Sequence, residues 1–488
     1  MFAIEINREN YEYDIQALVK SFYPEEQVAV LIPESRADKR AELEDKVRIR
    51  LNIEENGATL SVDGRDYHFE QPEGEDYKGS LKRFLYKVLC RETGKELPWG
   101  NLIGIRPTKI AYGLLEEGKS REEIVEHYRR EHYTSTEKAE LAVDIAQRER
   151  ALLADVHYQG GYSQGCGGDG YSLYVGIPFC PTTCLYCSFT SYPIGGYRKQ
   201  VDAYVDCVIK EMEFVADRYR DKILDSVYVG GGTPTTLEPE QLDRMISRLK
   251  ELFDFSNVKE FTVEAGRADS ITEEKLRVLY RHGVNRISVN PQTMKQETLD
   301  LIGRKATVVQ VEEAFALARR IGFDNINMDL ILGLPGETEA DVQRTIDRVV
   351  ELAPDSLTVH SLAIKRASRL NQWIQENGVS MLRNTDETMK IAAKGAEKLG
   401  LVPYYLYRQK NMSGNFENVG YAREGKLGLY NILIMEEKQT IVALGAGSIT
   451  KRVFPDGRLE RCENVKDVAS FIERIDEMIE RKRKLFED

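Results

Sequence analysis

From Tyr171 onward, two hydrophobic patterns alternate along the chain. Short apolar runs rich in β-branched residues are each followed by a longer stretch with apolar residues at helical spacing. The predicted strands are 173–177, 226–229, 260–264, 286–289, 326–332 and 356–360, and the predicted helices are 201–219, 240–253, 273–282, 309–322 and 339–352. Repeated βα units predict a parallel sheet with right-handed crossovers. Six such units indicate the α/β class, and because the alternation fades after His360, a closed eight-stranded barrel is not expected.

The N-terminal part has a less regular pattern. Strands are expected at 2–6, 28–32, 47–53 and 58–62, the last two joined by a turn at Asn56-Gly57. Helices are expected at 11–22, 81–91 and 134–156, with Cys90 in the core. These elements predict an α+β accessory domain over residues 1–157. A glycine-dense linker, 158–170, then separates it from the barrel, 171–364.

The C-terminal region, residues 365–488, begins with a predicted helix at 386–399. Two apolar runs, 429–435 and 440–444, are interpreted as strands, and a charged helix is expected at 465–486. We expect this third, α+β region to pack across the open side of the barrel.

Composition and charge restrict the partners. The 68 Lys and Arg against 80 Asp and Glu give a net charge of −12, which disfavours non-specific binding to nucleic acid. No run of apolar residues is long enough for a membrane span, and the N-terminus lacks the pattern of a signal peptide. Seven cysteines, several of them clustered, argue for a reducing compartment. The expected location is the cytoplasm.

The strongest chemical signal is the spacing of Cys180, Cys184 and Cys187, directly after an apolar strand. Thiolates are soft ligands that favour zinc or iron–sulfur clusters. Structural zinc normally takes four protein ligands, and no fourth Cys or His lies within a few residues. Three thiolates instead fit a cubane cluster with one open iron. A zinc knuckle and three inert buried thiols are the alternatives, and Cys166 in the linker is either a fourth thiol or an incidental one.

This cysteine spacing resembles that of the radical S-adenosylmethionine (SAM) enzymes. The resemblance implies a [4Fe–4S] cluster bound by Cys180, Cys184 and Cys187. It further implies that the open iron chelates the amino and carboxylate groups of SAM, whose reductive cleavage gives a 5′-deoxyadenosyl radical. A partial (β/α)6 barrel is the architecture of that family, and the resemblance implies the same barrel for residues 171–364.

Further motifs follow the predicted strands. Gly231, Gly232 and Thr233 end the second strand, where glycines permit a close approach of backbone and ligand. Together with the spacings to Glu264, Gln292, Arg304 and Asp329, they resemble oxygen-independent coproporphyrinogen III oxidase and its relatives. The N-terminal part, the stretch 98–109, Arg267 and the stretch 405–411 resemble the HemZ-type members.

The resemblance implies roles for single residues. Tyr174 and Tyr186 would border the cluster and SAM. Gly231, Gly232 and Thr233 would contact the methionine portion of SAM, and Ala363 the adenine. Glu264, Gln292 and Asp329 would hydrogen-bond the polar atoms of SAM, while Arg304 would pair with its carboxylate. For each polar residue, an ion pair between barrel loops is the alternative.

The chain also departs from this pattern. Phe189 stands where the oxidase has a further cysteine, and Gly176 where it has a histidine. The run Glu264-Ala-Gly-Arg267 replaces the Glu-Ala-Asn-Pro of relatives. Haem-chaperone relatives carry His-Asn-x-x-Tyr-Trp, and the nearest match is Glu417-Asn418-Val-Gly-Tyr421-Ala422. These changes leave SAM cleavage as the expectation and the substrate open.

The leading functional hypothesis is oxidative decarboxylation of porphyrinogen propionates to vinyl groups, in haem biosynthesis. The expected partners are a coproporphyrinogen III-like tetrapyrrole and reduced flavodoxin or ferredoxin, without nucleic acid or a membrane span. The alternatives are a haem chaperone and another radical reaction on a tetrapyrrole, such as ring opening with methyl transfer. Candidate cations for the substrate carboxylates are Arg106, Lys109, Arg267, Arg408 and Lys410, with ordinary surface charge as the other reading.

Overall fold

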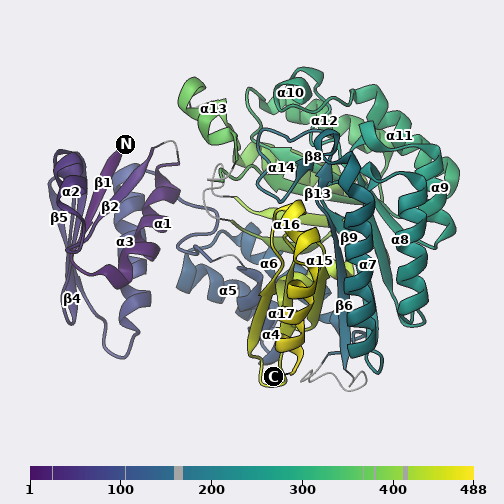
Figure 1. The fold of residues 1–488 in the computed structure, drawn as a ribbon. Helices are drawn as coiled ribbons and strands as arrows, with labels where there is room; N and C mark the ends of the chain where they lie inside the picture. Colours follow the sequence, from purple (N-terminus) through teal and green to yellow (C-terminus); the bar gives the residue numbers. More distant parts are fainter. Residues whose placement is uncertain are drawn as a thin grey trace. The chain divides into compact units, whose positions relative to one another are not determined.

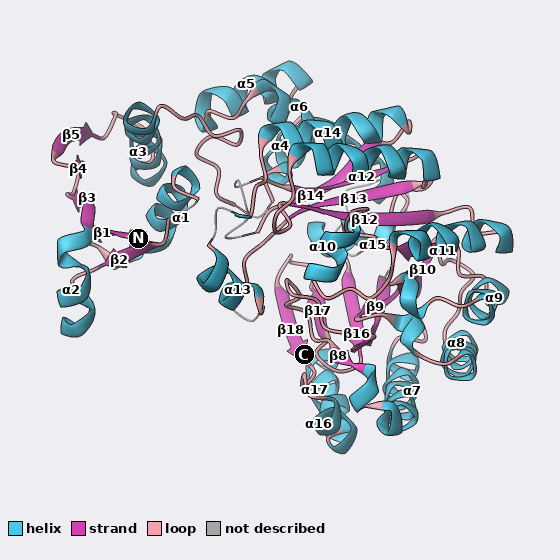
Figure 2. Cartoon of the chain, turned by 90° about the horizontal axis from the view of Figure 1, so that it is seen from above, coloured by secondary structure: helices cyan, strands magenta, loops and turns pink. Residues whose placement is uncertain are grey.

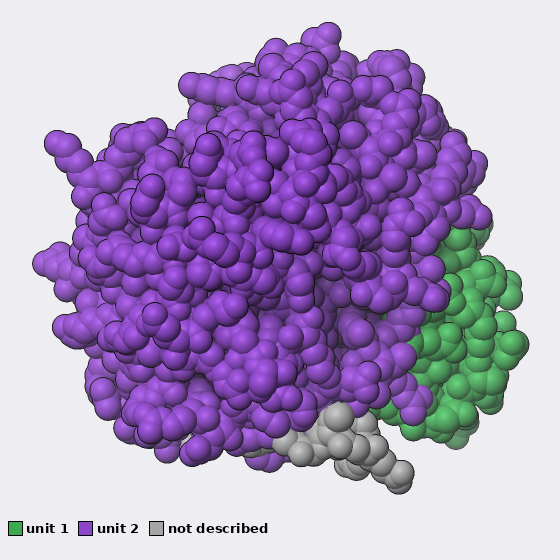
Figure 3. Space-filling model, turned by 90° about the vertical axis from the view of Figure 1, so that its right-hand side faces the viewer, with its two compact units in different colours: residues 1–147, 406–417 green, residues 148–405, 418–488 purple. Residues whose placement is uncertain are grey.

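The computed structural model describes the chain except residues 25, 105, 159–168, 366–367, 379–380, 410–415 and 488. Most of the predicted linker, with Cys166, therefore lies outside the described residues, and so does Lys410. The described chain divides into two compact units, coloured in Figure 3. Unit 1 comprises residues 1–147 and 406–417, and unit 2 comprises 148–405 and 418–488. This division assigns most of the predicted C-terminal region to the same unit as the barrel.

Unit 1 contains a five-stranded sheet in the order β2-β1-β3-β4-β5. Its strands are β1 (Phe2–Ile6), β2 (Val28–Leu31), β3 (Val47–Ile53), β4 (Gly57–Val62) and β5 (Arg65–Glu70). One face packs against α1 (Glu12–Phe22) and α3 (Tyr77–Thr93), and buries Leu18, Phe22 and Leu85. On the other face Leu43, at the end of α2 (Ala37–Leu43), packs on Ala3 and Leu31. The edge strand β5 was not predicted, because its exposed polar residues hide the apolar alternation.

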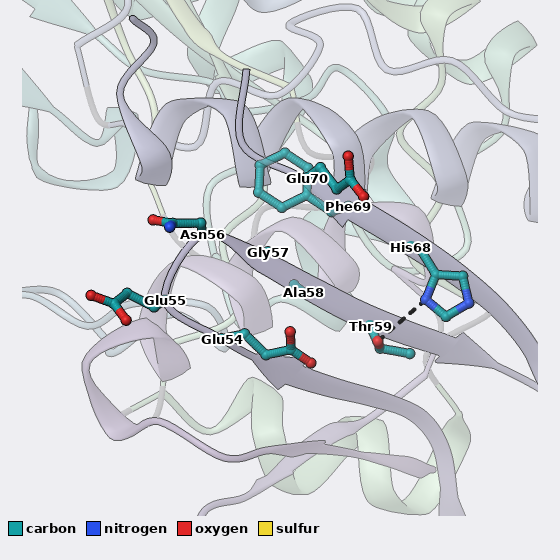
Figure 4. A pocket seen from close by; sticks show the side chains of 9 residues that line it. All are labelled: Glu54, Glu55, Asn56, Gly57, Ala58, Thr59, His68, Phe69 and Glu70. Carbon is teal, nitrogen blue, oxygen red and sulfur yellow. Dashed lines mark hydrogen bonds between the residues drawn. The ribbon is translucent and has the colours of Figure 1, made fainter. Parts of the chain in front are cut away.

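Helices α4 (Thr108–Glu116), α5 (Arg121–His132) and α6 (Thr136–Leu153) follow the sheet of unit 1. A shallow hollow lies at the β3–β4 turn (Figure 4). Acidic side chains of Glu54, Glu55 and Glu70 line it, and Thr59 and His68 are hydrogen-bonded at 3.4 Å between Oγ1 and Nδ1. None of the residues predicted for the cluster or SAM lies in this hollow.

Unit 2 is built on an eleven-stranded sheet in the order β14-β15-β13-β12-β11-β10-β9-β6-β16-β17-β18. The predicted six parallel strands form its centre: β6 (Gly170–Ile177), β9 (Ile223–Gly231), β10 (Glu260–Gly266), β11 (Arg286–Val289), β12 (Ile326–Leu332) and β13 (Ser356–Ser361). The predicted α/β class and partial barrel are confirmed.

Helices cover the outer side of this curved sheet, as Figures 1 and 2 show. They are α7 (Val201–Arg218), α8 (Pro239–Leu252), α9 (Glu273–Arg281), α11 (Val308–Ile321) and α12 (Glu339–Leu352). Unit 2 also contains the helices α10 (Gln296–Leu301), α13 (Leu370–Asn377) and α14 (Asp386–Lys398). The cysteine loop contains two short strands, β7 (Phe179–Cys180) and β8 (Tyr192–Pro193).

The C-terminal region differs from the prediction in three ways. The run predicted as a strand at 429–435 is helix α15 (Leu429–Glu436), and the single charged helix is two helices, α16 (Val468–Glu473) and α17 (Ile475–Glu487). The region extends both edges of the sheet: β14 (Val402–Tyr407) and β15 (Asn418–Ala422) beyond β13, and β16 (Thr440–Leu444), β17 (Ile449–Val453) and β18 (Leu459–Glu463) beyond β6. Among the described residues, no helix is both long and apolar enough to cross a membrane.

Candidate functional site

The six parallel strands of unit 2 have two chemically different faces. Residues that face outward toward the helices, such as Leu173, Val227 and Met328, are apolar and fully buried. The register between neighbouring strands places a set of mostly polar residues together on the opposite, inner face. This inner set is Ser172 and Tyr174 of β6, Ser226 and Tyr228 of β9, Thr262 and Glu264 of β10, Arg286 and Ser288 of β11, Asn327 and Asp329 of β12, and Thr358 and His360 of β13. A polar interior is unsuited to a packed core and suited to a polar ligand.

The predicted cysteine ligands lie on the loop that follows β6. Cys180 lies in β7, with its Sγ 3.4 Å from Oγ1 of Thr233, and Cys187 Sγ lies 3.5 Å from Oγ of Ser191. Cys184 is buried and accepts a contact from Nη1 of Arg267 at 3.7 Å. Burial raises the pKa of the Cys180 thiol to about 11, with the Cys187 and Cys184 thiols adding to the effect. In the metal-free protein this thiol is therefore protonated at neutral pH, and a metal must displace its proton.

The glycines after β9 fix this loop from one side. The amides of Gly232 and Thr233 donate to the carbonyls of Ile177 and Phe179 at 2.8 and 2.7 Å. A Cβ on Gly232 would lie 2.5 Å from the carbonyl oxygen of Phe179, and Gly231 has a φ of +106°. At Gly232 the backbone thus closely approaches the cysteine loop, and the predicted contact of these glycines with a ligand stays a prediction.

Glu264, predicted as a SAM contact, lies among tyrosines. The hydroxyl of Tyr228 donates to its carboxylate, and Tyr228 stacks on Tyr174 and on Tyr430 of α15, with ring centroids 6.2 and 4.4 Å apart. Burial raises the pKa of Glu264 to about 7, and Asp329 raises it further while Tyr228 lowers it. Near neutral pH the carboxyl is poised between two charge states, which is typical of functional sites.

On the neighbouring strands Asp329 accepts from Nδ2 of Asn327 at 2.7 Å. His360 lies on the same inner face, and burial lowers its pKa while Asp329 opposes the shift. Asp329 thus lies within electrostatic range of both Glu264 and His360. A cationic or hydrogen-bond-donating ligand would relieve the repulsion between the two carboxylates.

Several buried polar atoms in β11 and in the segment that follows it have no hydrogen-bond partner within the described chain. They are Ser288 Oγ, Asn290 Oδ1, Gln292 Oε1, Arg286 Nε and Arg304 Nε. Gln292 also has a left-handed backbone, with φ +69°, fixed by hydrogen bonds of its N and O to Asp329 and Ile331 at 2.9 Å. Orphaned buried groups and a strained non-glycine residue are costly unless a ligand uses them. They point to a polar ligand in the barrel.

Arg304 is also tied to the cysteine loop. Its Nη1 donates to the carbonyl of Asn290, and Tyr186 and Cys184 raise the pKa of its guanidinium against the effect of burial. Tyr186 packs on the apolar cluster that contains Ile302. The structure thus brings Tyr186 and Arg304 to one cysteine of the loop. Ala363 follows β13, beyond Leu362, whose amide donates to the carbonyl of Leu332 at 2.9 Å.

Two of the candidate cations for substrate carboxylates have other partners. Arg267 is 3 % exposed and forms a bidentate ion pair with Asp269. Arg408, in unit 1, donates to the carbonyl of Leu102 at 2.6 Å and lies over the ring of Trp99. Burial lowers its pKa to about 10 although Glu417 opposes this. Both arginines are engaged within the protein.

Three comparisons with known proteins bear on this arrangement. Residues 174–349 match the model of the Radical SAM superfamily. The chain is 39 % identical over 414 residues to the oxygen-independent coproporphyrinogen-III oxidase-like protein HemZ of Bacillus subtilis, covering 84 % of this chain and 81 % of that protein. The chain therefore belongs to the HemZ-type, oxygen-independent coproporphyrinogen-III oxidase-like family of radical SAM proteins.

Two further matches cover less of this chain. The haem chaperone HemW of Lactococcus lactis is 36 % identical over 194 residues, which cover 40 % of this chain and 49 % of that protein. Among solved structures, coproporphyrinogen III oxidase (HemN) from Escherichia coli, described as a radical SAM enzyme, matches with a TM-score of 0.52 and 23 % identity over 67 % of this chain and 72 % of that one. This likeness supports the fold. Relatives of this family thus include a protein named as a chaperone as well as ones named for the oxidase.

Radical SAM proteins use a [4Fe–4S] cluster and SAM, and the residues of this site fit both groups. The described part of the chain holds no group of three His, Cys, Asp or Glu arranged around a single metal ion. A cluster of four irons spaces its ligands more widely than one ion does, and thiolates are its usual ligands. Three thiols on one loop, next to orphaned polar atoms, provide soft donors for a cluster and hydrogen-bonding groups for a polar ligand.

Some residues of the site were missed from the sequence. Tyr228, Arg286, Ser288, Asn290 and His360 all lie in or next to strands that were predicted, on the face that carries Glu264 and Asp329. The available signal was the partial alternation within these strands, in which polar residues at every second position, such as Arg286 and Ser288 of β11, pick out the inner face. Tyr430 had no such signal, because its run was interpreted as a strand.

Proposed function

We propose that the chain is a radical SAM oxidoreductase that decarboxylates propionate side chains of a porphyrinogen to vinyl groups, with coproporphyrinogen III as substrate. The family membership and the polar, partly unsatisfied barrel interior support a SAM-dependent reaction. When bound, the cluster and SAM supply a 5′-deoxyadenosyl radical, which can remove a hydrogen atom from an unactivated C–H bond.

In this proposal the chain's own residues hold and orient the reacting groups. Cys180, Cys184 and Cys187 ligate the cluster. Arg304 pairs with the carboxylate of SAM, and Gln292, Glu264 and Asp329 accept from or donate to its other polar atoms. A ligand cation next to Glu264 stabilises the ionised form of this residue, so binding is expected to lower the raised pKa of Glu264 and release a proton.

The remaining roles concern SAM's position and its isolation from water. Tyr174 and Tyr186 border the cluster and SAM, the backbone at Gly231, Gly232 and Thr233 contacts the methionine portion, and Ala363 contacts the adenine. The stacked rings of Tyr174, Tyr228 and Tyr430 exclude water behind Glu264. Reduced flavodoxin or ferredoxin is the proposed electron donor for SAM cleavage. The substrate radical loses CO2 and one electron as the vinyl group forms, and an external one-electron acceptor takes that electron.

The observation that favours this enzyme over a haem chaperone is that the side chain of Glu417 is buried and hydrogen-bonded. This residue stands at the position nearest to the histidine of the chaperones' motif, and it is fully buried. Its carboxylate accepts from Nζ of Lys138 at 2.6 Å and from Nε1 of Trp99 at 2.7 Å. A carboxylate committed to two buried donors is not free to become an axial haem ligand.

Product analysis tests the proposal. The anaerobically reconstituted protein is given dithionite, SAM and coproporphyrinogen III, and 5′-deoxyadenosine, CO2 and the vinyl product are measured. We expect all three products, and none with the Cys184→Ala variant. Formation of 5′-deoxyadenosine without turnover of the porphyrinogen would refute the proposed substrate but would be consistent with a radical SAM enzyme. Stoichiometric haem binding with no product would favour the chaperone.

A further inference from the structure

Arg267 has a position that the SAM chemistry does not account for. It follows β10 directly after Gly266, whose φ of +66° is a left-handed conformation that suits glycine. The carbonyl of Gly266 accepts from the amide of Asn290 at 2.7 Å, which holds the turn in place. The chain therefore leaves the strand in a fixed direction, and the Arg267 side chain reaches the cysteine loop.

Every nitrogen of the Arg267 guanidinium has a partner. Nε and Nη2 donate to the two carboxylate oxygens of Asp269 at 3.0 and 2.7 Å. Nη1 faces the cysteine loop, where it contacts the carbonyl and hydroxyl oxygens of Thr182 at 3.0 and 2.8 Å and Sγ of Cys184 at 3.7 Å. The hydroxyl of Thr182 in turn donates to the carbonyl of Gly303 at 2.8 Å. The guanidinium thus holds the loop and presents a positive charge to one cysteine sulfur.

The environment makes this charge effective. Arg267 is 3 % exposed and Cys184 is 8 % exposed, so water screens little of the interaction between them. Hydrogen bonds to the ligand sulfurs and the local net charge are among the factors that set the reduction potential of iron–sulfur clusters. A cation next to a ligand sulfur stabilises the reduced state, which carries one more negative charge.

We propose that Arg267 is a positioning residue that raises the reduction potential of the cluster through its contact with Cys184. The inference depends on Cys184 being a cluster ligand and is independent of the porphyrinogen substrate. The step is the transfer of one electron from an external reductant to the oxidised cluster. No bond is made or broken, and Arg267 stabilises the added charge while Asp269 partly offsets it.

The two members of the ion pair should have opposite effects on the potential. Replacing Arg267 with Gln removes the cation, and we expect reduction of the cluster to become about tenfold less favourable, a fall of about 59 mV for a one-electron couple. The Asp269→Asn variant removes the offsetting carboxylate and leaves Arg267 in place, so the potential should rise. The Arg267→Lys variant retains the positive charge but lacks the planar guanidinium that contacts Asp269 and Cys184 together. Its reduction potential should lie between those of wild type and Arg267→Gln.

The test is a redox titration of the reconstituted holoenzyme with dithionite, followed by the EPR signal of the reduced cluster. SAM binding to the oxidised proteins is measured by calorimetry, and equal affinity for wild type and Arg267→Gln is expected, because Arg267 has its nitrogens engaged elsewhere. Opposite shifts in Arg267→Gln and Asp269→Asn support the inference. Unchanged potentials, or shifts of the same sign in both variants, would overturn it.

If Arg267→Gln fails to hold a cluster, the reduction potentials of Asp269→Asn and Arg267→Lys are compared with that of wild type to test the inference. A rise in the first variant and a fall in the second support the inference, and any other pair of shifts overturns it. A wild-type protein that assembles no cluster would overturn the inference together with the ligand assignment. Failure of porphyrinogen turnover leaves these potentials unaffected, so the two proposals fail separately.

Discussion

At the scale of single residues, the site is built from groups that are costly without a ligand. Glu264 has a raised pKa, Gln292 has a strained backbone, and Arg304 and Ser288 have buried atoms without a partner in the described chain. Each feature lowers the stability of the ligand-free protein. Functional sites commonly combine activity with such a cost, so removing one group should stabilise the fold and impair binding.

The Glu264→Gln variant tests this trade-off. Because the pKa of Glu264 in the folded protein is about 7, above its ordinary value, the folded state binds more protons than the unfolded state between these two values. Wild-type stability should therefore fall as the pH rises through this range. Above pH 7 the buried carboxyl of Glu264 is ionised, and its full destabilising effect should be present. Glutamine does not titrate, so the ligand-free variant should have a higher free energy of unfolding than wild type. We expect this advantage to be larger at pH 8 than at pH 5 by roughly 1–3 kcal/mol.

Denaturant unfolding at the two pH values measures this difference, with the exposed Glu424→Gln as the matched control. SAM binding to the reconstituted Glu264→Gln variant should be weaker than to wild type. An equal stability difference at both pH values would show that Glu264 does not titrate as described.

At the scale of elements, the parallel strands were predictable because their outer faces are apolar and their inner faces polar, as in β12 with Met328 and Asp329. The run at 429–435 was misread, because a short helix buried on most sides, as α15 is, shows no amphipathic period. The edge strand β5 is mostly exposed, and only Tyr67 and Phe69 form its short apolar face. The Cys spacing could be read from the sequence, but contacts between distant segments, such as Tyr228 with Tyr430, could not.

The Gly232→Ala variant tests how the β9 turn holds the cysteine loop. An added Cβ would lie 2.5 Å from the carbonyl oxygen of Phe179 and 2.8 Å from that of Ile177, so backbone must move. We expect a loss of about 1–3 kcal/mol in stability and a lower iron content after reconstitution. In Gly195→Ala, the control, the added Cβ meets nothing within 4 Å. Equal iron content in both variants would contradict this role of Gly232.

At the scale of the whole molecule, the chain enters unit 1 a second time at Leu406, near the end of β14, and leaves it after Glu417, directly before β15. The described ends of this returning segment, 406–409 and 416–417, are held in unit 1 by the contacts of Arg408 with Leu102 and of Glu417 with Lys138 and Trp99. Burial would raise the pKa of Glu417, but Lys138 and the Trp99 hydrogen bond outweigh it and keep the pKa below its ordinary value. Stability from this pair is present above the ordinary pKa and is lost as the pH falls through the lowered value.

Breaking this pair should weaken unit 1. Glu417→Ala leaves the Lys138 ammonium buried without this partner, so we expect a loss of about 3–5 kcal/mol. Urea unfolding followed by the fluorescence of Trp99, in a Trp373→Phe background, reports on this unit, and Glu424→Ala is the exposed control. A loss no larger than that of the control would show that the pair does not stabilise the segment.

The central claim is that Cys180, Cys184 and Cys187 hold a cluster with an open iron at the ends of the barrel strands, where the protein presents SAM. The most direct measurement is the EPR spectrum of the reconstituted, dithionite-reduced protein with and without SAM, together with its iron and sulfide content. We predict iron and sulfide in the equal amounts of a [4Fe–4S] cluster and a spectrum that SAM changes. Full iron binding after replacement of all three cysteines by Ala, or a spectrum indifferent to SAM, would contradict the account.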